Sequence, residues 1–151
     1  MKKNKQNKRT PTGDAFTDLV LETFRFNGSL METGDRLIEH LGVTSALWQV
    51  LGTLQDAPLS MAQIARNMGL TRQSVRRSAY RLKDRGLVVF LENPNHQRAK
   101  LIELTQKGRN ILKKINQIQI KWANEVSTEF SEKELYDAIE TMRRLGEKLK
   151  I

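Results

Sequence analysis

Hydrophobic residues recur at helical spacing along most of this chain and alternate in one short region. Apolar positions three and four residues apart predict helices over 14–41, 44–54, 61–68, 72–85, 105–126 and 132–149. Leu87–Leu91 and Lys100–Leu104 instead have the composition of two strands, and Asn93-Pro94-Asn95 forms the turn between them. The pattern therefore predicts a mainly helical (α+β) fold with a single β-hairpin.

Capping residues stand where these helices should begin. Ser60 with Gln63, and Ser131 with Glu134, have the spacing of a capping box, in which each residue bonds to the backbone of the other. Single Thr residues precede three further helices, and Gly residues follow several helix ends. The Thr caps are Thr44, Thr71 and Thr105, and the terminating glycines are Gly42, Gly69 and Gly86.

Residues 60–85 have the spacing of a DNA-binding helix-turn-helix. Ala65 is small enough for two helices to cross closely, Gly69 provides the positive φ of a tight turn, and Val75 fills the angle between the helices. An ordinary αα-corner would show the same three positions. The second helix favours DNA binding, because six of residues 71–85 are basic and only Asp84 is acidic.

The outer face of that second helix is the predicted recognition surface. Val75, Ala79 and Leu82 share one face and should be buried. Arginine binds guanine or phosphate with two hydrogen bonds, and Gln73 has the groups to read adenine. We expect Gln73, Arg76 and Arg77 to face the major groove. The full set of candidate contacts is Thr71, Arg72, Gln73, Ser74, Arg76, Arg77, Tyr80 and Arg81.

The hairpin that follows makes the lobe a winged helix. A wing of this kind reaches the adjacent minor groove or backbone, and an arginine suits a narrow, electronegative minor groove. A polar hairpin tip alone would indicate little; its place directly after the recognition helix gives it meaning. The candidate wing contacts are His96, Gln97, Arg98 and Lys100.

Charge is distributed unevenly along the 151 residues, whose net charge is +9. Residues 60–109 hold eleven basic and three acidic residues, whereas residues 14–59 hold two basic and seven acidic ones. Such a field favours nucleic acid as a partner. Residues 1–13 contain five cations, and we expect a disordered basic arm, acting either as a solubilising tail or as a contact to phosphate.

Composition also excludes several classes of function. The chain has no Cys and two distant His residues, which argues against disulfides, thiol sensing and a metal site. We find no phosphate-binding Gly loop, His-Glu-x-x-His or Gly-x-Ser-x-Gly motif, so an enzyme and a cofactor are not expected. Without a signal peptide or an apolar run of membrane-spanning length, a cytoplasmic protein with no membrane partner is expected.

From Gly42 to Gly108 the sequence resembles the MarR family of bacterial transcriptional regulators. The matching segments are LGVTSALWQVLGTL, LSMAQIARNMGLTRQSVRRSAYRLKDRGLVV and RAKLIELTQKG. The family's wing usually carries Asp-x-Arg, and this chain has His96-Gln97-Arg98 instead. The arginine is kept, but the carboxylate that would orient it is absent.

The resemblance implies an organisation and a function for the rest of the chain. Residues 14–151 would form one MarR-type domain, with a winged lobe at 43–108 and dimerisation helices at 14–42 and 109–151. A homodimer would also cover apolar stripes that are difficult to bury within a single chain, although packing within one chain is an alternative. The implied protein is a repressor on an inverted-repeat operator; a basic architectural or replication-associated DNA-binding protein without an effector is the alternative.

Many MarR-type proteins resemble sensors that release DNA when a small aromatic or anionic molecule binds. Phe24, Phe26, Met31 and Trp48 are the side chains that could line such a pocket. An ordinary core role is the favoured expectation for each of these residues, and a ligand pocket is the alternative. The sequence does not identify a ligand.

Overall fold

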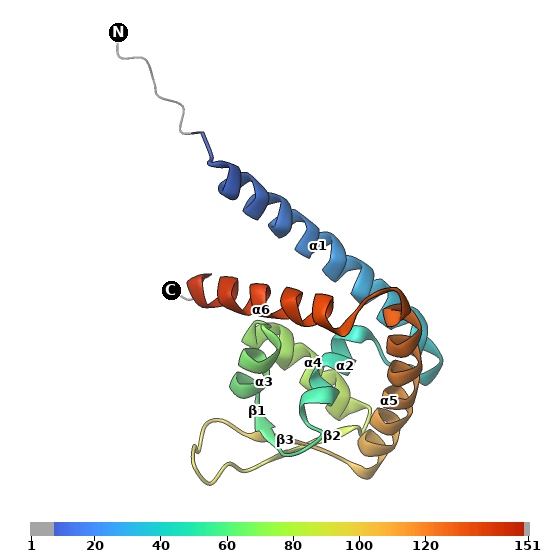
Figure 1. Cartoon of the computed structure of the whole chain (residues 1–151). Coiled ribbons are helices and arrows are strands. Elements are labelled where there is room, and N and C mark those ends of the chain that lie inside the picture. Colours follow the sequence, from blue (N-terminus) through green and yellow to red (C-terminus); the bar gives the residue numbers. More distant parts are fainter. Residues whose placement is uncertain (1–7, 150–151) are drawn as a thin grey trace. The chain divides into compact units, whose positions relative to one another are not determined.

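The computed structural model describes residues 8–149, which form two compact units that divide between Leu112 and Lys113. Six α-helices and a three-stranded sheet account for most of this range. Figure 1 shows the elements in chain order. The first unit contains α1 (Pro11–Ile38), α2 (Ser45–Thr53), α3 (Met61–Met68), α4 (Arg72–Asp84), β1 (Leu59–Ser60), β2 (Val88–Leu91) and β3 (Leu101–Leu104).

Helix α1 begins earlier than the sequence pattern predicted. Pro11 occupies its first turn, and the Thr10 hydroxyl accepts a hydrogen bond of 3.0 Å from the Gly13 N–H. Proline is favoured at this position because its missing N–H would have had no helical partner. The expectation of a disordered arm is therefore wrong for residues 11–13. For residues 1–7 that expectation lies outside the described part of the chain.

Ser45, the first residue of α2, connects α2 to α1. Its N–H donates to Asp35 Oδ1 at 2.6 Å, and its hydroxyl donates to the Met31 carbonyl at 2.9 Å. Gly34 lies directly against this serine, and a Cβ there would come within 2.3 Å of Ser45 Oγ. The contact joins α1 to the same compact unit as the winged lobe.

The predicted hairpin is present and gains a third strand. Strands β2 and β3 pair antiparallel from Val88↔Leu104 to Leu91↔Leu101. The missed strand β1 pairs with the other edge of β3, with Ser60 opposite Leu101, so the order is β1-β3-β2. Two residues are too few for an alternating pattern, and the sequence therefore did not reveal this strand.

The core of the winged lobe lies where α2, α3 and α4 pack on one another and on the sheet. Its fully buried side chains come from each of these elements and include Val50, Leu51, Ile64, Val75, Leu82 and Ile102. Burying Val75 and Leu82 leaves the opposite face of α4 to solvent. The core thus fixes which side of this helix faces outward.

The second unit contains the greater part of α5 (Gln106–Val126) and all of α6 (Glu132–Leu149). A short 3-10 turn at Ser127–Glu129 separates the two helices. No residue of α6 is buried, and its apolar side chains include Leu135, Tyr136, Ile139 and Met142. Within the described residues this helix therefore presents an uncovered apolar stripe.

The capping box predicted at Ser131 starts α6 and makes its stability depend on pH. The Ser131 hydroxyl and N–H both donate to Glu134 Oε2, at 2.6 and 2.8 Å, and the Ser131 side chain accepts from the Glu134 N–H at 3.2 Å. The side-chain hydrogen bond from Ser131, and then the backbone one, lower the pKa of Glu134 below its ordinary value of 4.5. A carboxylate with a lowered pKa in the folded state stabilises that state above its ordinary pKa, and this contribution disappears as the pH falls.

Replacing Glu134 with Gln should therefore lower the melting temperature at neutral pH and have a smaller effect in acid. The measurement is the difference in Tm between wild type and Glu134→Gln across pH 7 to 3. This difference should begin to shrink as the pH falls below about 4.5, where Glu134 of the unfolded chain becomes protonated, and should disappear below the lowered pKa of the folded state. A difference that stays constant over this range would show that the charge of Glu134 does not contribute.

Candidate nucleic-acid interface

Three local hydrogen-bonded structures fix the start and the angle of α4. The Ser60–Gln63 capping box is complete, with contacts of 2.8 and 3.3 Å, and it begins α3. Gly69 ends α3 with φ of 63°, and Thr71 then accepts the Ser74 N–H at 3.1 Å. The helix-turn-helix predicted from Ala65, Gly69 and Val75 is confirmed as a fold.

The predicted recognition residues lie together on the solvent side of α4. Ser74 is half-buried and the other seven are exposed. Within residues 8–149, no carboxylate forms an ion pair with Arg72, Arg76, Arg77 or Arg81. Their positive charge is thus available to an outside ligand.

Tyr80 is in contact with the hairpin, which the sequence analysis missed. Its ring meets the half-buried Phe90 ring of β2 edge-on, with centroids 5.2 Å apart and planes at 78°. The Arg76 guanidinium carbon lies 5.2 Å from the Tyr80 centroid, and Lys83 Nζ lies 4.9 Å from the Phe90 centroid. Strand alternation could have placed Phe90 on the inward face of β2 with buried Val88, but it does not indicate the contact with Tyr80.

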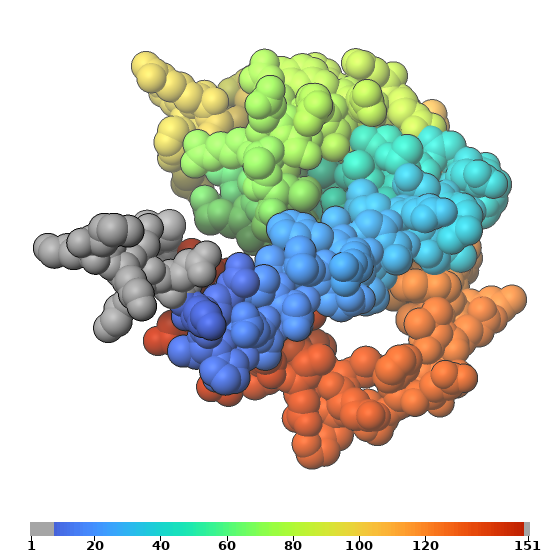
Figure 2. Space-filling view, turned by 90° about the horizontal axis from the view of Figure 1, so that it is seen from above, coloured from blue at the N-terminus to red at the C-terminus, as the bar shows by residue number. Residues whose placement is uncertain are grey.

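The wing is the loop of residues 92–100 that joins β2 to β3. Two turns shape it, in which the Asn93 side chain accepts the Asn95 N–H at 3.0 Å and the His96 carbonyl accepts the Ala99 N–H at 3.1 Å. His96, Gln97 and Arg98 are exposed near its end, and Figure 2 shows this yellow loop projecting from the green surface of α3 and α4. Lys100 lies at its base and pairs with Glu92 at 3.5 Å, so its charge is partly offset.

The segment from Leu104 to Gly108, at the end of β3, connects the hairpin to α5. The Thr105 hydroxyl donates to the Gly86 carbonyl at 2.6 Å and accepts the Gly108 N–H at 3.0 Å, which caps α5 as predicted. The Thr105 N–H donates to the Leu87 carbonyl at 3.0 Å. Gly108 also lies on this carbonyl, because a Cβ there would be 2.0 Å from the Leu87 oxygen. These contacts therefore hold Gly86 and Leu87, which follow α4, against the start of α5.

The proposed effector residues do not gather in one pocket. Phe24 is 71% and Phe26 55% exposed, so the alternative of an ordinary core within this chain is wrong for both. Residues 21–30 of α1 are exposed on every side, since no element of the first unit covers them. Met31 and Trp48 are half-buried at the junction of α1 and α2, where Met31 Sδ accepts from Gln49 Nε2 at 3.7 Å.

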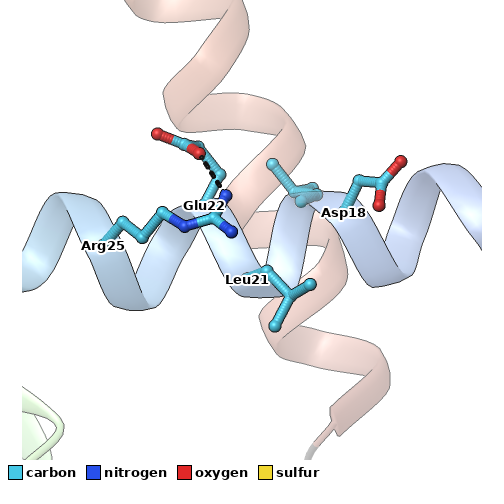
Figure 3. A pocket seen from close by; sticks show the side chains of 5 residues that line it. Asp18, Leu21, Glu22 and Arg25 are labelled. Atoms are coloured by element: carbon cyan, nitrogen blue, oxygen red, sulfur yellow. Dashed lines mark hydrogen bonds and ion pairs between the residues drawn. The ribbon is translucent and has the colours of Figure 1, made fainter.

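One open hollow on α1 is lined by residues of that helix alone. Figure 3 shows Asp18, Leu21, Glu22 and Arg25 there, with Arg25 and Glu22 joined by an ion pair of 3.3 Å. None of the effector candidates lines this hollow. A lining from a single helix surface does not enclose a small molecule.

Residues 8–149 contain no group of three or more His, Cys, Asp or Glu side chains that could hold a metal ion. In the same range, no helix combines the length and the apolar character that crossing a membrane requires.

A helix-turn-helix with an outward basic helix and a following hairpin defines a winged-helix DNA-binding protein. Comparison with known proteins narrows this class. The model of the MarR family matches residues 41–99. The chain is 33% identical to the uncharacterized protein Rv2011c of Mycobacterium tuberculosis over 132 residues, covering 87% of this chain and 92% of that protein.

One further relative and one solved structure of similar fold are named as transcriptional regulators. The HTH-type transcriptional regulator TcaR of Staphylococcus aureus is 31% identical, with 67% of this chain and 68% of TcaR covered. The structure of the M. tuberculosis transcriptional regulator MOSR in complex with DNA matches with a TM-score of 0.75 and 23% identity, over 87% of this chain and 98% of that one. This chain belongs to the MarR family. It is a DNA-binding transcriptional regulator and not an enzyme.

Proposed function

We propose that this regulator binds duplex DNA by placing α4 in the major groove and the wing beside the adjacent minor groove. The observation that carries the proposal is the exposed face of α4, whose arginines have no carboxylate partner within the described residues. Arg98 provides the same chemistry on the wing. The assigned contacts are Thr71, Arg72, Gln73, Ser74, Arg76, Arg77, Tyr80 and Arg81 on or at the start of α4, and His96, Gln97, Arg98 and Lys100 on the wing.

Gln73 and Arg77 are the residues we assign to reading bases. They lie four residues apart on one exposed stripe of α4, and that stripe is opposite the buried Val75 and Leu82. Both side chains are free to extend into a groove. Bidentate contacts to adenine and guanine are the pairings that these side chains form in a major groove.

Arg77→Ala should weaken binding to the preferred sequence by about 1–3 kcal/mol and relax the preference at one base position. The DNA is a duplex that the wild-type protein selects from a random pool, with a scrambled duplex for comparison. Arg36→Ala on α1 is the matched control, because Arg36 is exposed and lies far from α4 in the chain. Wild-type affinity of Arg77→Ala for both duplexes would refute the assignment.

The apolar surface of α1 and α6 supports a homodimer as the DNA-binding form. Leu21, Phe24, Phe26 and Leu30 are exposed on α1, and Tyr136 and Leu149 on α6 are 61% and 65% exposed. Exposed large apolar residues gathered on a helix mark an interaction surface. A two-fold dimer would bind an inverted repeat whose half-sites lie about one helical turn apart. In this arrangement 14–42 and 109–151 carry the dimer and 43–108 carries the DNA contacts.

We assign this dimer the role of a repressor. We also assign it to the cytoplasm. The regulator bound at its operator would exclude other proteins from the promoter. A small aromatic or anionic molecule would release the operator, and the half-buried Met31 and Trp48 are the nearest candidates to bind it. Phe24 lies two helical turns before Met31, on the same side of α1.

Footprinting on DNA around the protein's own gene tests this function. A discrete palindromic footprint is the expected result. Sequence-independent coating would favour the architectural protein instead, which the net charge of +9 supports. An effector would be recognised as a compound that abolishes the footprint at a fixed protein concentration.

A further inference from the structure

Four side chains connect the exposed side of α4 to strand β2 of the hairpin. Arg76 lies over the ring of Tyr80, Tyr80 meets Phe90, and Lys83 lies over the ring of Phe90. Both cations are exposed, Tyr80 is 41% exposed, and Phe90 is half-buried. Each ring therefore holds one cation at the surface while the two rings join α4 to strand β2 of the hairpin.

Three of these residues, Arg76, Tyr80 and Lys83, lie on successive turns of α4. Residues 76, 80 and 83 are spaced by four and three, so they are neighbours along one side of the helix. Arg76 lies roughly 60° around the helix from Gln73 and roughly 100° from Arg77. It is thus on the flank that faces the hairpin and not on the stripe that we assign to reading bases.

Contact with a ring leaves the N–H donors of both cations available to an anion. A ring contacts the flat face of a guanidinium, while the N–H donors point outward from the guanidinium edge. Lysine over a ring remains a point charge with free donors. When a helix lies in the major groove, the sugar–phosphate backbone runs along its flank, and a phosphate oxygen is the acceptor that meets such donors.

We propose that the Tyr80–Phe90 pair positions Arg76 and Lys83 to bind two phosphates of one DNA backbone, so that α4 and the wing engage DNA as one unit. The proposal rests on the DNA-binding mode proposed above. Tyr80 is then a positioning residue, and Arg76 contributes affinity without reading sequence. This separates Arg76 from Gln73 and Arg77, with which the sequence had grouped it.

Arg76→Ala tests whether this residue contacts phosphate or a base. Phosphate contacts carry no sequence information, so affinity for the selected and for the scrambled duplex should fall by the same factor. The slope of log affinity against log salt should decrease by about 0.9 for one lost contact. Arg77→Ala is the matched control on the same helix and should weaken only the selected duplex. A loss confined to the selected duplex in Arg76→Ala would overturn the proposal.

Tyr80 is tested by a pair of variants that separate the ring from the hydroxyl. Tyr80→Phe keeps the ring that holds Arg76, so it should weaken binding to both duplexes less than Tyr80→Leu does. Tyr80→Leu should weaken both about two- to fivefold, as expected for losing an exposed cation–ring contact. In the Arg76→Ala background the same Tyr80→Leu change should have a smaller effect, because the cation that the ring holds is already gone. Phe90→Leu removes the other ring of the Tyr80–Phe90 pair. Thermal unfolding of each variant, compared with wild type, shows that the variant folds.

Two further readouts make the outcomes distinct. In the free protein, NMR should show upfield-shifted Arg76 side-chain protons that lose this shift in Tyr80→Leu but keep it in Tyr80→Phe. Fully additive effects of Tyr80→Leu and Arg76→Ala, with normal wild-type binding, would overturn the positioning role alone. Failure of the wild-type protein to bind either duplex would overturn the proposed binding mode and this inference together.

Discussion

Replacing Gly108 with alanine is expected to lower the free energy of unfolding by about 1–3 kcal/mol. A methyl group at this position would lie 2.0 Å from the Leu87 carbonyl oxygen and 3.3 Å from Leu104 Cδ2. The oxygen cannot move aside, because it is backbone and already accepts the Thr105 N–H. The start of α5 must therefore shift away from β2, which breaks that hydrogen bond and the contacts of Thr105 with Gly86.

Urea denaturation of Gly108→Ala and of Gly52→Ala measures this effect against a matched control. Gly52 lies in α2 of the same unit, and a Cβ there meets no atom within 4 Å. Alanine at 52 should leave stability unchanged or raise it slightly, because alanine is the better helix former. Equal stability of the two variants would show that the close approach of Gly108 to Leu87 is unimportant in solution.

Phe24→Glu is expected to convert the proposed dimer to monomer and to reduce operator affinity by about 100-fold or more. Phe24 is 71% exposed, so the substitution removes little packing within the chain. In a two-fold dimer the same change removes apolar burial from both protomers and adds two negative charges to the interface. A monomer contacts only one half-site, so it loses the added affinity that comes from binding two linked half-sites at once.

Sedimentation analysis and operator titration on the same samples test this expectation. Ser29→Glu is the control, because it adds the same charge to an exposed position on the opposite side of α1. That variant should remain dimeric and bind as wild type. A monomeric wild-type protein, or a dimeric Phe24→Glu variant, would show that α1 is not the interface.

Sequence reasoning was most reliable where one residue type has one local task. Thr44, Ser60, Thr71 and Ser131 cap the helices they were expected to cap, because each needs only an N–H two or three residues away. The burial of Val75 and Leu82 followed from helical periodicity, and it placed the basic residues of α4 outward without knowledge of the rest of the fold.

Contacts between distant segments were beyond the same reasoning. The pairing of β1 with β3, the edge-on contact of Tyr80 with Phe90 and the bonds from Ser45 to α1 each depend on two segments meeting in space. The exposure of Phe24 depends on which elements fail to cover α1, and no local pattern contains that information. The start of α1 at Pro11 was missed because Thr10 and Pro11 follow a basic run that suggested disorder.

The close fit between Gly34 and Ser45 constrains how this sequence can drift. Alanine at 34 would collide with the serine hydroxyl, yet it would lie 3.4 Å from the serine Cβ, a tolerable separation between carbon atoms. With alanine at 45, position 34 can accept alanine and gain about 1 kcal/mol of helix propensity, roughly what the lost hydrogen bond to Met31 contributed. A protein with alanine at both positions is thus nearly as stable as one with Gly34 and Ser45. The two substitutions can be reached only in one order, in which position 45 changes before position 34.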